Sequence, residues 1–155
     1  MSETDLPALV ELTIETFRPF YEDYVRELMG DELFERQHGR WRADYRDQVP
    51  RLHAPAAGRH VAVREMDGCV AGYVAWAVGP KARHGEISML AVARDRRGQG
   101  VGRELCDHAI AQMRRSGVEV VGIGTGDDAF HSAARALYES LGFTKVPIAG
   151  YLKRI

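Results

Sequence analysis

Three glycines, at positions 98, 100 and 102, follow the apolar stretch 90–93 and the basic turn 94–97 and open a segment with helical spacing. They therefore occupy a turn between a strand and a helix. Glycine leaves the backbone N–H groups of such a turn accessible, and a helix N-terminus attracts negative charge. Arg96, Arg97 and Arg103 lie beside the glycines. The stretch predicts a binding site for a phosphorylated ligand, such as one that carries a pyrophosphate.

Two common phosphate-binding motifs do not fit this turn. The Walker motif ends in Gly-Lys-Ser/Thr, which is absent here. The dinucleotide fingerprint G-x-G-x-x-G would need a third glycine where the chain has Arg103 or Leu105. A second glycine-rich stretch, 122–127, has Asp127 at the equivalent position. These departures disfavour a nicotinamide-dependent oxidoreductase.

The pattern Arg97-x-x-Gly100-x-Gly102 is similar to the acetyl-CoA-binding signature (R/Q-x-x-G-x-G/A) of the GNAT superfamily of N-acetyltransferases. A second stretch, 134–143, reads Ala-Arg-Ala-Leu-Tyr-Glu-Ser-Leu-Gly-Phe and resembles the later family motif A-x-x-L-Y-x-x-x-G-F. The order and spacing of the two motifs also match, and the resemblance covers roughly residues 58–155. It implies that acetyl-CoA is the acyl donor and that a primary amine, on a small molecule or a protein, attacks it directly in a ternary complex.

The resemblance also implies which residues hold the cofactor. Main-chain N–H groups of the strand before the turn would polarise the thioester carbonyl, and the turn itself would wrap the pyrophosphate. His131 lies three residues before Ala134, where many relatives have an Asn that contacts the pantetheine arm or a water. The predicted cofactor-binding residues are Leu90, Ala91, Val92, Arg97, Gly98, Gln99, Gly100, Val101, Gly102, Arg103 and His131.

Tyr138 and Glu86 are the predicted catalytic residues. By spacing alone Tyr138 is a core residue of an amphipathic helix, but the family motif implies that it protonates the leaving thiolate. A phenol of pKa near ~10 suits a thiolate of pKa near ~8.5. Glu86 lies four residues before Leu90, like the base of the lysine-acetylating branch, and we expect it to share a strand face with Leu90 toward an apolar cleft. A solvent-exposed role for Glu86, His84 as the base, or a water chain remain alternatives.

The remaining pattern predicts the elements that position these residues. Helical spacing begins at Asp5 and is expected to break at Arg18-Pro19, and a second helical region covers 21–49 with an interruption near Gly30. Strands are predicted at 59–66 and 69–78, joined by an Asp67-Gly68 hairpin. There follow a strand at 86–92, a helix at 100–116, a strand at 118–125, a helix at 131–141 and a final strand at 143–155.

This order predicts an α/β fold (an α+β mixed sheet) in one domain over 1–155. The segment 5–50 would be the helical acceptor side, and 58–155 the sheet and the acetyl-CoA-binding core. The resemblance implies antiparallel strands plus a splayed parallel pair, with helices on both faces. Because Asp5-Leu6-Pro7 resembles a helix start that a strand usually precedes, we expect the first strand to be short or absent.

Composition excludes several other classes of function. The net charge is −1, which gives no general attraction to nucleic acid or to an anionic membrane. No apolar run approaches the ~20 residues that span a bilayer, and no signal peptide begins the chain, so we expect a cytoplasmic protein. Cys69 and Cys106 have no metal-ligand spacing and are expected to be buried, and we predict no metal.

The sequence does not identify the amine. Its binding site is expected in the helical region 21–49 and the loop 79–85, where aromatic residues are either a cleft lining or simply core: Tyr21, Tyr24, Phe34, Trp41 and Tyr45. A homodimer is compatible with a domain of this size. The alternative function is an acyl-CoA-binding sensor or scaffold domain without catalysis.

Overall fold

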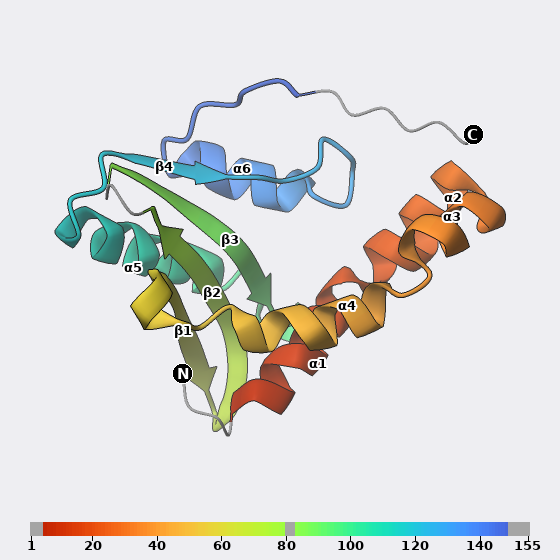
Figure 1. The fold of residues 1–155 in the computed structure, drawn as a ribbon, viewed down its shortest axis with the longest axis horizontal. Helices are drawn as coiled ribbons and strands as arrows, with labels where there is room; N and C mark the ends of the chain where they lie inside the picture. Colours follow the sequence, from red (N-terminus) through yellow and green to blue (C-terminus); the bar gives the residue numbers. More distant parts are fainter. Residues whose placement is uncertain (1–4, 80–82, 149–155) are drawn as a thin grey trace.

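The computed structural model describes residues 5–79 and 83–148 and places a four-stranded sheet between two groups of helices (Figure 1). The helices of the first part are α1 (Leu6–Pro19), the π-helix η2 (Phe20–Val25), α2 (Arg26–Met29), α3 (Asp31–His38) and α4 (Trp41–Gln48). The strands and later helices are β1 (Arg59–Met66), β2 (Cys69–Val78), β3 (His84–Val92), α5 (Val101–Arg115), β4 (Val120–Ile123) and α6 (Ser132–Ser140).

The β1–β2 hairpin forms with the predicted bounds and turn. Asp67 has φ +53° and Gly68 φ +75°, the left-handed geometry that two-residue hairpin turns need. The sheet order is β1-β2-β3-β4, with β2 antiparallel to both of its neighbours and β4 parallel to β3. The mixed sheet is therefore confirmed.

The parallel pair is short, and its two strands separate. β3 and β4 pair only from His84 with Val120 to Ile87 with Ile123. β3 then continues to Val92, whereas β4 ends at Ile123. The predicted splay is confirmed, and it leaves the second half of β3 without a partner strand on that side.

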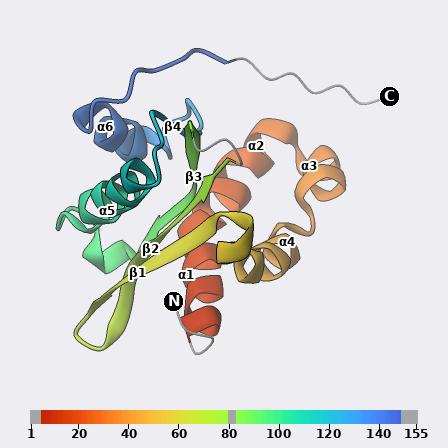
Figure 2. The ribbon, with the colours of Figure 1, turned by 60° about the vertical axis from the view of Figure 1, so that its left-hand side comes forward.

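Helices cover both faces of the sheet (Figure 2). On one face, α5 packs against β2 and β3 through five apolar side chains, all buried as the helical spacing predicted: Val101, Leu105, Cys106, Ala109 and Met113. On the other face, α1 packs against Tyr73, Ala75, Met89 and Ala91 of the sheet. A third cluster, around Phe34 and Trp41, joins the helices of the first part to one another.

α1 ends at Pro19, where the break was predicted, but the chain continues as a π-helix instead of leaving the helical conformation. α1 passes directly into η2, in which Arg26 donates its N–H to the carbonyl of Tyr21 five residues earlier. The predicted interruption near Gly30 is confirmed, because Gly30 has φ +73° between α2 and α3.

Two other expectations differ from the structure, and a third agrees with it. Residues 143–148 of the predicted final strand have no regular secondary structure, and its remainder, 149–155, lies outside the described residues. Cys69 is exposed, because it begins β2 at the hairpin, whereas Cys106 is buried as expected. Residues 5–58 contribute no strand to the sheet, which agrees with a short or absent first strand.

A buried hydrogen bond fixes α1 on the sheet. The Thr13 hydroxyl donates to the carbonyl of Leu9 at 2.6 Å and lies 2.5 Å from the Tyr73 hydroxyl of β2. Both side chains are fully buried, and burial raises the pKa of Tyr73 to about 12.

Removing one partner of this pair should destabilise the protein unequally. Thr13→Val leaves the buried Tyr73 hydroxyl without its hydrogen-bond partner and should lower the free energy of unfolding by about 1–3 kcal/mol. Tyr73→Phe should lower it by about 1 kcal/mol, because Thr13 keeps its hydrogen bond to Leu9. The double variant should lose less than the sum of the two single losses. Urea unfolding of the four proteins measures this, and strictly additive losses would contradict the coupling.

Candidate functional site

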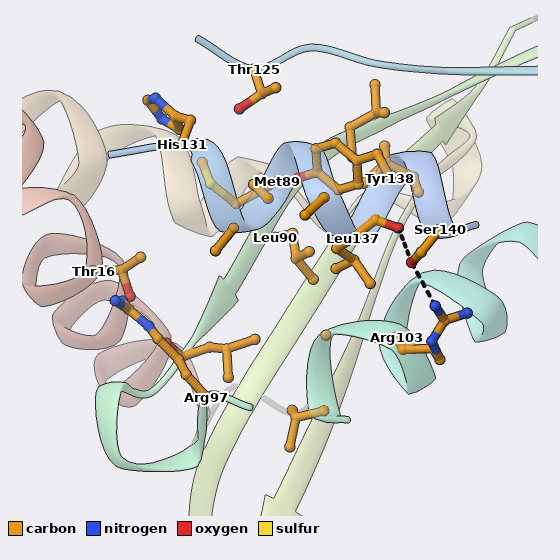
Figure 3. Close-up of a pocket in the computed structure, with 18 of the residues that line it drawn as sticks. Thr16, Met89, Leu90, Arg97, Arg103, Thr125, His131, Leu137, Tyr138 and Ser140 are labelled. Atoms are coloured by element: carbon orange, nitrogen blue, oxygen red, sulfur yellow. Dashed lines mark hydrogen bonds between the residues drawn. The ribbon is translucent and has the colours of Figure 1, made fainter. Parts of the chain in front are cut away.

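A cavity of about 620 Å³ lies where β3 and β4 separate (Figure 3). β3, the glycine turn, the first turn of α5 and the cavity-facing side of α6 form most of its wall. Thr16 and Phe17 of α1 and the segment after β4 complete it. The splay of the parallel pair thus opens a site between segments that are far apart in sequence.

The glycine turn presents a helix N-terminus to this cavity. Gly98 and Gly100 have φ +74° and +85°, and nothing lies within 4 Å of where a Cβ would stand. Gly102 serves packing instead, because a Cβ there would meet Leu137 Cδ2 of α6 at 3.2 Å. The first N–H groups of α5, from Val101 onward, have no acceptor within the helix. The turn therefore offers unobstructed backbone donors.

Arginine side chains stabilise and charge the turn. The Arg97 Nε donates to the carbonyl of Val92 at 3.1 Å, which folds the turn back onto the end of β3. Arg103 donates to the Ser140 hydroxyl at 2.5 Å and so links α5 to α6 (Figure 3). Both line the cavity together with Arg96, and the lining in the described residues contains no Asp or Glu. This end of the cavity favours an anion.

The predicted strand residues lie on two faces of β3. Leu90 and Val92 line the cavity. The Ala91 side chain is buried on the opposite face against the α1 side, and the Ala91 backbone pairs with Tyr73 of β2. Gln99 does not line the cavity in the described residues; its amide donates to the carbonyl of Asp95 at 2.8 Å and closes the turn.

Tyr138 lines the cavity from α6. Its side chain is 9 % exposed, and burial, with a smaller contribution from Cys106, raises the pKa of the phenol to about 12. The ring packs edge-on to Phe143, with centroids 6.1 Å apart. Tyr138 is therefore neutral at physiological pH and available as a hydrogen-bond donor in the cavity.

Glu86 lies apart from the other predicted residues. It is exposed and absent from the described lining. The Glu86 side chain lies on the other face of β3 from the one expected, because β3 carries a bulge. Met89 pairs with Ala75 and Ile87 with Trp76, which leaves Ser88 without a partner in β2. An extra residue in a strand reverses the alternation of side chains, so Glu86 does not share a face with Leu90.

The sequence reasoning missed an acid–base pair at the start of α6. His131 Nδ1 lies 2.7 Å from Asp128 Oδ2, and the two side chains are 14 % and 8 % exposed. Burial alone would raise the pKa of Asp128, but hydrogen bonds from the His131 ring and backbone outweigh it and lower the pKa. An Asp three residues before a His at a helix start was the available signal.

The aromatic residues of the helical part mostly fill the core. Phe34 and Trp41 are buried, 1 % and 3 % exposed, and are absent from the described cavity lining. Phe17 reaches the cavity instead and lies near Phe130, with ring centroids 6.4 Å apart. His131 contacts Phe20 and Phe130, each with centroids 4.8 Å away. The helical part therefore reaches the cavity through α1, and Phe20 of η2 contacts the cavity-lining His131.

The site is therefore a cavity at the end of a splayed parallel pair, bordered by a glycine turn. The chain matches the acetyltransferase (GNAT) family over residues 8–143 and belongs to that family. No helix among residues 5–79 and 83–148 is long and apolar enough to cross a membrane.

Individual relatives are similar over limited stretches. A mycothiol acetyltransferase of Beutenbergia cavernae is 40 % identical over 73 residues, which cover 47 % of this chain and 24 % of that protein. The chain spans less than half the length of the curated relatives it matches.

Solved structures agree with the fold. A GNAT acetyltransferase from Brucella melitensis in complex with acetyl-CoA has a TM-score of 0.63 at 22 % identity, covering 94 % of this chain and 80 % of that one. A ribosomal-protein-alanine N-acetyltransferase from Brucella melitensis has a TM-score of 0.65 at 15 % identity, covering 100 % and 95 %.

Proposed function

We propose that the protein transfers an acetyl group from acetyl-CoA to a primary amine by direct attack in a ternary complex. The observation that carries this proposal is that one cavity holds both the glycine turn and Tyr138. The unpaired half of β3 runs between them. Family membership and a relative crystallised with acetyl-CoA support the choice of donor.

The residues present fit an acyl-CoA. The backbone donors from Gly98 to Gly102, with Arg97 and Arg103 nearby, suit a diphosphate. The cavity-side backbone of Leu90 to Val92 would pair with the amide-bearing arm, as an added strand does at a sheet edge. His131 would border that arm, since it lies on the opposite wall of the same cavity.

Tyr138 would act on the sulfur. As the amine nitrogen bonds to the thioester carbon, the C–S bond breaks and its electron pair goes to sulfur. With a pKa of about 12, the phenol is a weaker acid than a thiol of pKa ~8.5. We therefore infer that it stabilises the developing thiolate mainly by donating a hydrogen bond.

Assays of free thiol release over an amine panel test the function. The wild-type protein should release CoA with at least one amine, and Tyr138→Phe should lower kcat about 10²-fold while the Kd for CoA stays unchanged. Binding of acetyl-CoA without thiol release on any amine would favour the alternative of a sensor or scaffold. Absence of CoA binding would contradict both.

The backbone geometry of the turn gives a second test, with a matched control. Gly100→Ala and Gly68→Ala both put a Cβ on a residue of positive φ with open space around it, so each should cost about 1–2 kcal/mol of stability. Gly100 lines the cavity, whereas Gly68 lies in the hairpin. Calorimetry should show CoA binding weakened about tenfold for Gly100→Ala alone. Equal Kd values for the two variants would contradict the placement of the diphosphate.

The resemblance to the lysine-acetylating branch of the family implies that Glu86 takes the proton from the amine. Because Glu86 is exposed and outside the described lining, it would act through intervening water. On this assignment, Glu86→Gln should flatten the acid limb of the pH profile of kcat/KM, since the amide cannot accept the proton. An unchanged profile would remove Glu86 from the mechanism.

A further inference from the structure

Asp128 and His131 form a buried pair whose proton chemistry the function proposed above does not use. The ring Nδ1 and the carboxylate Oδ2 are 2.7 Å apart, and the second carboxylate oxygen accepts the His131 backbone N–H at 3.1 Å. Both carboxylate oxygens thus bind the same residue. This arrangement fixes the position of the imidazole ring as well as the turn.

The loop that carries Asp128 is itself held in place. Arg135 Nη1 donates to the carbonyls of Gly126 and Asp128, both at 2.6 Å. A Cβ on Gly126 would lie 2.0 Å from Asp128 Oδ2 and 2.7 Å from His131 Nδ1, so the pair packs directly against a glycine. Such close support is typical of a side chain whose orientation matters.

The pairing decides which ring nitrogen is free. A carboxylate can only accept, so Nδ1 carries the proton that it shares with Asp128, and in the neutral ring Nε2 is left as an acceptor. His131 lines the cavity, and Figure 3 shows it at the start of the helix that carries Tyr138. The two residues are seven positions apart, about 10 Å along a helix axis, and a helical side chain such as Tyr138 leans back toward the N-terminus.

We propose that His131 Nε2, in place of the exposed Glu86, takes the proton from the attacking amine and that Asp128 is its positioning residue. The proposal rests on the acetyl transfer proposed above. As the C–N bond forms, one N–H proton moves to Nε2 and gives an imidazolium beside the carboxylate. The C–S electron pair goes to sulfur, where Tyr138 donates a hydrogen bond to the developing thiolate and the thiolate takes a proton from solvent. The imidazolium then returns its proton through solvent, so that amine and thioester give amide and thiol.

Asp128 is the charged group placed to govern this step. Arg135 faces the loop carbonyls, and Asp127 is drawn outward to Lys145, with Oδ1 2.6 Å from Nζ. The walls that α1 and β3 contribute near His131 carry no charge: Thr16, Phe17, Ser88, Met89 and Leu90. The rings of Phe20 and Phe130 lie against the imidazole and limit its hydration.

The pH dependence of kcat/KM for three single variants tests the proposal. His131→Gln should lower kcat/KM about 10²-fold and flatten the acid limb of its pH profile. Asp128→Asn keeps the backbone hydrogen bond but removes the charge, so the acid limb should move to lower pH by about one unit. His108→Gln, at an exposed histidine of α5 outside the described lining, should match the wild type.

Each outcome has a defined meaning. An active wild type whose acid limb survives His131→Gln overturns this proposal and leaves the acetyl transfer standing. So does a His131→Gln effect confined to a weaker Kd for CoA, which would make His131 a cofactor contact only. A wild type that releases no thiol overturns the proposed function itself. Independently of turnover, ¹⁵N spectra of labelled histidine should show the neutral His131 ring protonated at Nδ1, and the opposite tautomer would overturn the role of Asp128.

Discussion

The site depends on the point at which β3 and β4 stop pairing. After Ile87 and Ile123 the two parallel strands separate, and β3 continues alone to Val92. Unpaired backbone groups inside a protein need a partner, so the exposed side of β3 is a natural place for an extended, amide-bearing ligand. The glycine turn begins α5 and Tyr138 belongs to α6, so both helices border the opening.

The bulge at Ser88 lies next to that separation and sorts the side chains of β3. Beyond it, Leu90 and Val92 face the α5 side, while Met89 and Ala91 pack with the α1 side. Before it, the alternation is reversed, so Ile87 joins the α5 side. One extra residue therefore places Glu86 on the opposite face of β3 from Leu90.

Charge divides the cavity into two ends. Arg96, Arg97 and Arg103 gather at the glycine turn, where backbone donors add to their field. At the start of α6, Asp128 and His131 form a hydrogen-bonded pair against aromatic rings. An anion is favoured at the first end, and proton exchange is possible at the second. Tyr138 lies on the helix that leads away from the second end.

The sequence by itself determined the local elements and the glycine turn. The bounds of β1 and β2, the Asp67-Gly68 turn and the buried face of α5 follow from short-range periodicity and from residues that tolerate positive φ. Only the tertiary structure decided what surrounds the cavity. A π-helix continued the helical conformation beyond Pro19, a bulge reversed the phase of Glu86, and a loop clamped by Arg135 brought Asp128 against His131. Each depends on packing between segments distant in sequence, which periodicity along the chain does not record.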